Sequence, residues 1–407
     1  MALFWIGVAA LLAALLLVLV LGRRSAEASA AAAVHAASRA VAQEALDPDT
    51  TPIVERRSDA TAAGNATRDA PPASHAKAGT TPEAPRPAPV EVRQPSAALA
   101  AFRPVRAEDL PDERRSGYIE TFKNIPRPPK LLHHLLSPDF VNASSASQLV
   151  DLIAGEPLLA ARILTVVNSP LYGLSTPMSS IGQAVTYLGL NAVRSLCLQY
   201  VLIASFRPDS VDRKRMVHAT WEASALGSEM AQQLSQRLGF EDRGSIVSAV
   251  VLSFLGRLAI IAALSRGTLD TVARGSFLQR TEAEQAVLGL GASQIGRLLM
   301  QEWGLPERIV GDASEVDAVL WTPADALDAE RGPRVALCYL CARLGERLAA
   351  DPALDLALVD PMADRGDDFF HLRDTLARSG LADRLLPALH APELQTRLRK
   401  VHSAMRE

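Results

Sequence analysis

The first residues of the chain form an uninterrupted apolar stretch, from Ala2 to Gly22, that contains no charged side chain. An α-helix needs about 20 such residues to cross the roughly 30 Å hydrocarbon layer of a membrane. A cleaved signal peptide is the alternative, but it carries a basic region before a shorter apolar stretch. No basic residue precedes Ala2, so we expect a transmembrane helix over residues 2–22.

Two arginines, Arg23 and Arg24, follow the apolar stretch directly. Basic residues next to a transmembrane helix stay on the cytoplasmic side and thereby set the orientation of the helix. We therefore expect a single-pass membrane protein whose N-terminus faces out and whose residues after Arg24 lie in the cytoplasm.

The composition changes abruptly between residues 23 and 117. Residues 31–100 contain 21 Ala and 9 Pro, but Leu46, Ile53 and Leu99 are their only Leu, Ile, Phe, Trp or Tyr residues. A segment of this kind buries too little apolar surface to offset the entropy that it loses on ordering. We expect a disordered linker over residues 23–117, with an end-to-end distance on the order of 50 Å.

From Tyr118 onward the sequence shows the periodicity and the start and stop signals of amphipathic helices. Ser144 or Ser145 can cap a helix that Gly155 ends, and Pro157 suits the first turn of the next helix. Residues 158–167 are apolar nearly all round, so we expect that helix in the core. No sustained alternation of apolar and polar residues indicates a sheet. The sequence therefore predicts an all-α fold, with further helices over residues 181–189, 192–206, 221–238, 245–264, 292–303, 333–350, 367–378 and 391–405.

Four sequence blocks between residues 125 and 312 resemble the HDOD domain, a helical output domain of bacterial signalling proteins. They are the proline-rich Ile125–Pro129, the block Glu156–Gly173, Ile181–Val185 followed by Leu188-Gly189, and Trp303–Pro306. The resemblance implies an HD-like multi-helix bundle over residues 118–315. Residues 316–407 would then be a C-terminal helical extension, either packed on the bundle or folded as a small subdomain.

The resemblance also links the chain to the HD metal-dependent phosphohydrolases, in which His and Asp side chains hold one or two divalent metals. The residues that align with those ligands here are Ala223 or Ser224, the pair Ser253 and Phe254, and Ala292. No histidine occurs between positions 218 and 371, so a shifted alignment does not restore the site. We therefore expect no metal, no cofactor and no catalytic residues.

The three cysteines, Cys197, Cys338 and Cys341, cannot form a disulfide framework. Cys338 and Cys341 have the spacing of half a zinc site, but zinc needs four ligands and the sequence offers no second pair. Cys341 falls on the same helix face as Leu337 and Leu344, which favours core packing over metal binding.

Polar residues at the end of the apolar helix 158–167 are candidates for recognition. Arg162, Asn168, Ser169 and Tyr172 could together form an interaction surface. Alternatively, Asn168 satisfies the carbonyl groups of its own helix end and anchors the loop that follows. Both interpretations stay open at the level of sequence.

The formal net charge is −3, and no aromatic residues accompany the basic cluster Arg213–Arg215. We therefore do not expect nucleic acid as a partner. The resemblance implies signal transduction: a non-catalytic module at the inner membrane of a bacterium, which binds other signalling proteins. The alternative is a domain that senses a small ligand, such as a nucleotide second messenger, without hydrolysing it.

Overall fold

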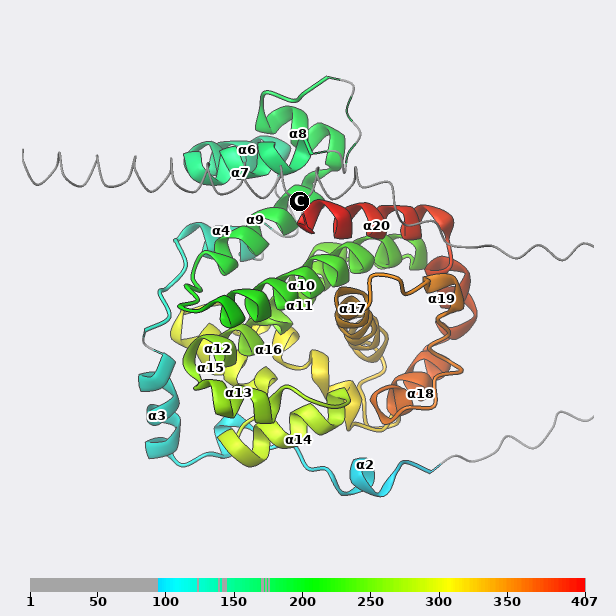
Figure 1. Ribbon diagram of the computed structural model, residues 1–407. Coiled ribbons are helices and arrows are strands. Elements are labelled where there is room, and N and C mark those ends of the chain that lie inside the picture. The colour runs from blue at the N-terminus through cyan, green and yellow to red at the C-terminus, as the bar shows by residue number, and fades with distance from the viewer. Residues whose placement is uncertain are drawn as a thin grey trace, which may run out of the picture. The chain divides into compact units, whose positions relative to one another are not determined.

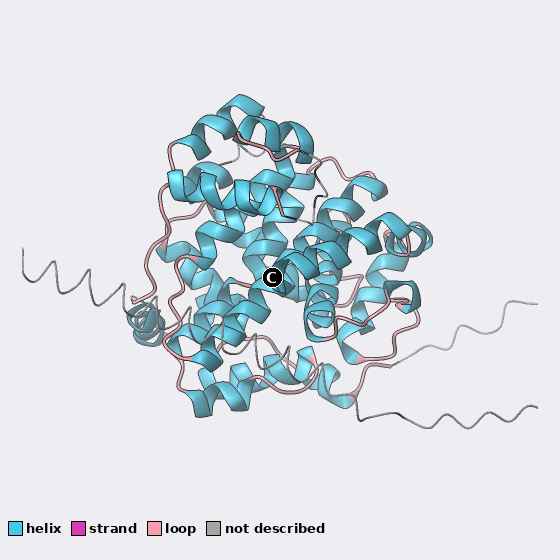
Figure 2. Cartoon of the chain, turned by 45° about the horizontal axis from the view of Figure 1, so that its top comes forward, coloured by secondary structure: helices cyan, strands magenta, loops and turns pink. Residues whose placement is uncertain are grey.

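The computed structural model describes residues 94–406, except residues 123, 138–139, 141–144, 170–171, 173 and 175. Every regular element in these described residues is a helix, which confirms the predicted all-α fold (Figures 1 and 2). The predicted transmembrane helix over residues 2–22, the orientation residues Arg23 and Arg24, and the linker up to residue 93 lie outside the described residues.

A group of short helices precedes the longest helix, and three of them, α6, α7 and α8, pack against one another and against α9. Ser145 and Ser180 cap α6 and α8, because each hydroxyl accepts a hydrogen bond from the backbone three residues on. Gln148 and Gln183 return a side-chain bond to the cap, which completes both capping boxes. The bounds of this group are α4 Leu131–Leu136, α6 Ala146–Ala154, α7 Pro157–Val167, α8 Ile181–Leu188 and α9 Leu190–Ile203.

The 28-residue helix α10, Val211–Leu238, contributes to two hydrophobic cores. The first core lies among α4, α6–α9, α12, α13, α15 and α16, and the second among α10, α11 and the helices after residue 316. The bounds of the middle helices are α11 Arg243–Ser253, α12 Leu255–Ala263, α13 Arg266–Val272, α14 Phe277–Leu288, α15 Ala292–Glu302 and α16 Glu307–Ser314.

The C-terminal extension packs directly on α10, with α17 lying against it (Figure 1). Glycines at this crossing let the two backbones approach: a Cβ atom on Gly345 would lie 2.4 Å from the carbonyl oxygen of Ala223. Because it shares the second core with α10 and α11, the extension is not a separate subdomain. Its elements are η3 Val316–Leu320, α17 Gly332–Ala350, η4 Leu356–Leu358, η5 Asp367–Phe369, α18 Phe370–Arg378, α19 Ala382–Leu389 and α20 Pro392–Arg406.

Ordered structure begins before residue 118, so the predicted end of the disordered linker is wrong. Residues 94–117, here called the N-terminal strap, contain α2 (Ala97–Ala101), η1 (Ala107–Asp109) and the start of α3 (Asp112–Phe122). Leu99 and Phe102 are buried in the second core, and Ala107 and Leu110 in the first. A few apolar residues, widely spaced in an Ala- and Pro-rich segment, are enough to fix the strap when they meet an existing core.

Two hydrogen-bonding glutamines hold the backbone of the strap. The Val105 amide donates to Gln285 Oε1 at 2.8 Å, and the Gln285 amide nitrogen donates to the Arg103 carbonyl oxygen at 2.7 Å. The Ala107 amide donates to Gln294 Oε1 at 3.0 Å. These partners lie on α14 and α15, so the pairing is long-range and is invisible in the local sequence pattern.

Helix α7 is less buried than its composition indicates. Leu159, Ile163 and Val167 lie in the first core, whereas the side chain of Leu158 is 86% exposed. The expectation that the whole of helix 158–167 lies in the core was therefore wrong for one of its faces. Its neighbours α6, α8 and α9 cover only the other face.

The segment expected as one helix over residues 245–264 is two helices, α11 and α12, which meet at the buried Phe254. At this break the chain moves from the second core, which contains most of α11, to the first core, which contains α12. Among the described residues, only the stretch Arg243–Ala263 is long and apolar enough to cross a membrane, and 78% of its most apolar 18-residue window is buried inside the protein. The same length and composition are found in core helices of soluble proteins.

The cysteines pack as core residues, as the helical spacing predicts. Cys197, Cys338 and Cys341 are all buried and free. Burial raises the pKa of the Cys197 and Cys338 thiols to about 12. Both side chains therefore stay protonated near neutral pH and are poor nucleophiles.

Candidate functional site

Packed side chains occupy the positions that the sequence resemblance aligns with HD-type metal ligands. Ala223 on α10 and Phe254 between α11 and α12 are 3% and 2% exposed and belong to the second core. The Ser253 hydroxyl donates to the Val250 carbonyl oxygen of its own helix, at 2.8 Å. Ala292 has no side-chain donor atom, and its backbone carbonyl oxygen packs against Gly256 of α12.

These residues do not fit a divalent metal. Alanine and phenylalanine side chains carry no donor atom, and the one hydroxyl of the set is bonded within its own helix. In the part of the chain that the structure describes, no group of three or more His, Cys, Asp or Glu side chains could hold a metal ion. No chemical step through a metal can be derived from this arrangement.

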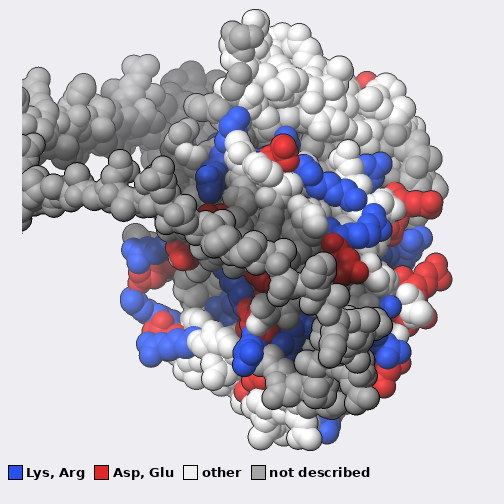
Figure 3. Space-filling view, turned by 90° about the vertical axis from the view of Figure 1, so that its right-hand side faces the viewer, with Lys and Arg blue, Asp and Glu red and all other residues white. Residues whose placement is uncertain are grey.

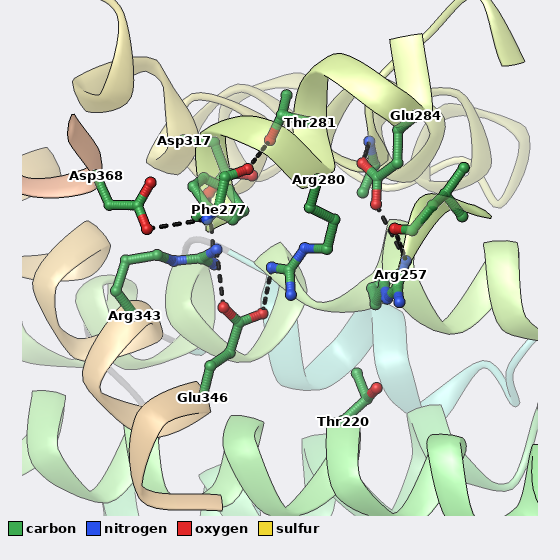
Figure 4. Close-up of polar contacts among 12 residues, drawn as sticks. Thr220, Arg257, Phe277, Arg280, Thr281, Glu284, Asp317, Arg343, Glu346 and Asp368 are labelled. Carbon is green, nitrogen blue, oxygen red and sulfur yellow. Dashed lines mark hydrogen bonds and ion pairs between the residues drawn. The ribbon is translucent and has the colours of Figure 1, made fainter. Parts of the chain in front are cut away.

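A buried network of charges lies beside Ala223 instead (Figure 4). Arg257 and Arg280 pair with Glu284 and Glu346, with nitrogen–oxygen distances of 3.2 and 2.6 Å. Arg343 adds a second guanidinium on Glu346, at 3.0 Å. Ala223, Arg257, Arg280 and Glu346 share the wall of a cavity of about 220 Å³.

The network is balanced in charge, because Arg343 also faces a third carboxylate, Asp317, at 3.6 Å. Burial raises the pKa of Glu284 and Asp317, while nearby arginines oppose that rise. For Glu346, burial also acts to raise the pKa, but Arg280 and Arg343 outweigh it and leave the pKa below its usual value. Three arginines and three carboxylates that neutralise one another hold α12, α14, η3 and α17 together, and leave no spare charge for a ligand.

Asn168 has the anchoring role that the sequence left open. Its side-chain nitrogen donates to the Met178 carbonyl oxygen at 2.8 Å, and its side-chain oxygen accepts from the Met178 amide at 2.7 Å. These two bonds tie the end of α7 to the segment just before α8. Asn168 does not line the cavity described next.

The other three predicted interaction residues come together in one cavity. Arg162, Ser169 and Tyr172 line a pocket of about 440 Å³ that α9, α10 and α20 complete. Arg162 is exposed at the pocket and has no ion-pair partner among the described residues. The helical spacing of the sequence could not reveal this pocket, because α20 is more than 200 residues away along the chain.

Buried polar side chains from α9 and α10 also line this pocket. The Gln199 side-chain nitrogen donates to the hydroxyl oxygens of Ser195 and Ser228, both at 3.1 Å. Two further buried polar atoms, Gln232 Oε1 and Trp221 Nε1, have no hydrogen-bond partner among the described residues. None of these five residues was predicted from the sequence; the i, i+4 pair of Ser195 and Gln199 on the mostly apolar helix α9 was the available signal.

Helix α20 forms the remaining wall, through Val401 and Met405. Glu229 of α10 is hydrogen-bonded to Arg397 of α20, so its charge is neutralised at the pocket. Farther along, His402 Nδ1 lies 2.8 Å from Glu222 Oε1, and both side chains are largely buried. The C-terminal extension therefore completes a site whose other walls belong to the preceding helices.

The molecular surface shows no large region of a single charge in the view of Figure 3, where basic and acidic side chains are interspersed. Within the basic cluster, Arg213 turns inward and donates to the carbonyl oxygens of Ala262 and Leu264, at 2.9 and 2.6 Å. It thereby caps the end of α12 and is not available to an external partner.

Comparison with known proteins identifies the domain. The HDOD domain model matches residues 125–318. The crystal structure of an HDOD domain protein of unknown function from Geobacter sulfurreducens aligns with a TM-score of 0.53 and 20% identity, covering 73% of this chain and 98% of that one.

A protein from Marinobacter aquaeolei VT8, thought to be a signal transduction protein, aligns with a TM-score of 0.49 and 18% identity, covering 73% of this chain and 66% of that one. The MmoQ response regulator of Methylococcus capsulatus aligns with a TM-score of 0.32 and 22% identity, covering 66% of this chain and 98% of that one. No curated protein matches the sequence. The HDOD domain model matches the region that contains the four sequence blocks, and the Geobacter structure shares the fold.

Proposed function

We propose that this chain is a non-catalytic signalling module whose HDOD domain binds other signalling proteins. The proposal is carried by the side chains at the four positions that we expect to align with HD metal ligands. Ala223, Phe254 and Ala292 carry no side-chain donor atom, and the hydroxyl of Ser253 is bonded within its own helix. A core that keeps the fold and lacks the donor atoms supports binding rather than hydrolysis.

The proposal includes attachment to the inner membrane of a bacterium, through a helix over residues 2–22 that Arg23 and Arg24 orient. A flexible linker would let the domain search for partners while it raises their effective concentration at the membrane. A reporter enzyme that is active only in the periplasm, fused after Glu407, tests the proposed cytoplasmic location of the C-terminus. Activity of this fusion would contradict that location.

Partner binding is tested by cross-linked capture from the native membrane. The full-length protein and a fragment of residues 94–407, which keeps the N-terminal strap, are compared. We expect a near-stoichiometric signalling protein with both, which would locate the binding surface on the helical domain. Recovery of no partner with either chain would contradict the proposal.

The absence of hydrolysis is tested separately, with a phosphodiester substrate and added Mn²⁺ or Fe²⁺. We expect no turnover above that of a matched Phe254→Ala variant, which has no new metal ligand. Metal-dependent turnover by the unaltered protein would contradict the non-catalytic assignment.

A second function, sensing of a small ligand, is favoured by one specific observation. The pocket between α7, α9, α10 and α20 has the size of a small-molecule site and contains buried polar atoms without partners. Sensing and partner binding are compatible in one module, because a ligand that contacts α20 can change the surface that α20 presents.

A further inference from the structure

We propose that the pocket between α7, α9, α10 and α20 binds a mononucleotide, with its base inside and its phosphate at Arg162. This inference deepens the sensing function proposed above and rests on it. It is carried by three properties of the pocket: aromatic walls, an unmatched donor and acceptor on its lining residues, and an unpaired positive charge at the edge.

The walls offer aromatic surfaces to a planar ring. Tyr172, Tyr200 and Trp221 all line the pocket, and the rings of Tyr200 and Trp221 meet edge to face with centroids 5.8 Å apart. An aromatic side chain can stack on any nucleobase, since every base has a π-face. The cavity of about 440 Å³ falls within the range of about 300–1,000 Å³ that small-molecule sites occupy.

Two lining residues each carry a polar atom that the protein leaves without a partner. The indole Nε1 of Trp221 is a donor and Oε1 of Gln232 is an acceptor, and both atoms are buried and unbonded among the described residues. Buried polar atoms are normally paired, so two orphans in one pocket indicate a missing partner. Nucleobase edges carry donors and acceptors side by side, which an apolar ligand does not.

The charge at the pocket selects an anion. Glu229 is neutralised by Arg397, whereas Arg162 is exposed and no described carboxylate pairs with it. Arg162 therefore leaves one uncompensated positive charge at the pocket, and a guanidinium holds phosphate through two parallel hydrogen bonds.

The test is calorimetric titration of the full-length protein in detergent with GMP, AMP, CMP and UMP, each beside its nucleoside. We expect at least one nucleotide to bind, at least about tenfold more tightly than its nucleoside, since a charge-assisted contact to phosphate is lost. In the Arg162→Gln variant the preference for the nucleotide over its nucleoside should be lost, while the affinity for the nucleoside stays the same. Arg308→Gln removes an exposed arginine on α16, away from the pocket lining, and should leave the preference unchanged.

Trp221→Phe keeps an aromatic ring and removes the indole donor, so it should weaken the nucleoside and the nucleotide alike. Thermal unfolding of each variant without ligand checks that the fold is retained. The proposal is overturned if no nucleotide binds below about 1 mM, or if Arg162→Gln leaves the nucleotide preference intact. Partner capture and the hydrolysis assay use no nucleotide, so the proposed function and this inference can fail independently.

Discussion

A Cβ atom built on Gly256 would lie 1.7 Å from the carbonyl oxygen of Ala292, closer than any real side chain approaches. Gly296 lies on the opposite side of the same contact, where its Cβ would be 3.0 Å from the Gly256 amide nitrogen. Helices α12 and α15 therefore touch through their backbones at Ala292, one of the positions that the sequence resemblance aligns with an HD metal ligand. Small residues, not polar ones, are what this contact requires.

We predict that Gly256→Ala lowers the free energy of unfolding by about 3 kcal/mol, because the two helices must separate. Gly311→Ala is the matched control. It lies in α16 with nothing within 4 Å of its Cβ position, so it should be neutral or stabilise the helix by about 0.5–1 kcal/mol. Denaturant unfolding of both variants checks the difference. Equal effects of the two substitutions would refute the close backbone contact.

Arg194 is a buried cation without compensation. Its side chain is 1% exposed, none of its three nitrogens has a partner among the described residues, and burial lowers its pKa to about 10. We predict that Arg194→Met raises the free energy of unfolding by about 1–3 kcal/mol, since an apolar side chain of similar length removes a buried charge. Arg308→Met, on the surface, should change it by less than about 0.5 kcal/mol. A destabilised Arg194→Met variant would contradict this reading of the site.

At the scale of secondary-structure elements, the charged network of Figure 4 links α12, α14, η3 and α17. Glu346 forms ion pairs with Arg280 and Arg343, so its removal takes one carboxylate partner from each arginine. We predict that Glu346→Gln lowers the free energy of unfolding by about 2–3 kcal/mol at neutral pH. The exposed Glu330→Gln is the control and should have little effect.

The same residue gives a pH dependence with a definite sign. The folded-state pKa of Glu346 lies below its unfolded value of 4.5. The stability that it contributes is therefore complete above pH 4.5 and is lost as the pH falls through the folded-state pKa. The difference in stability between the unaltered protein and Glu346→Gln should shrink on acidification below pH 4.5. A difference that grows there would show the sign to be wrong.

Local pattern predicted the elements well where an amphipathic face and a cap agree, as for α6 with Ser145 and Gly155. The local pattern failed where contacts with distant parts of the chain decide whether a segment is ordered or a helix face is buried. The sequence of α7 is apolar on faces that no neighbour covers, and the strap is sparse in apolar residues that nevertheless meet a core. The pocket shows the same limit: Arg162 and Tyr172 were candidates from local polarity, whereas Trp221 and Gln232 join them only through the packing of α10 and α20.

At the scale of the whole molecule, the N-terminal strap crosses from one core to the other. Leu99 and Phe102 are 3% and 7% exposed, and the Phe102 ring lies 5.6 Å from that of Trp321. We predict that a fragment of residues 118–407 is less stable than one of residues 94–407 by about 2–4 kcal/mol, after the entropy of ordering the strap is subtracted. Equilibrium unfolding of the two fragments measures the difference. Identical midpoints and slopes would mean that the strap contributes nothing.

Helix α20 lines the pocket at Arg162, the neighbouring cavity at Lys400 and an apolar cavity at Leu398. The family model ends at residue 318, so it is shorter than the segment that folds and forms the pocket here, whereas the Geobacter structure aligns over 73% of this chain. A gene fusion or a domain exchange cut at that boundary would transfer a bundle with an open flank. A domain cut at residue 318 would therefore lack the wall of the pocket that α20 supplies.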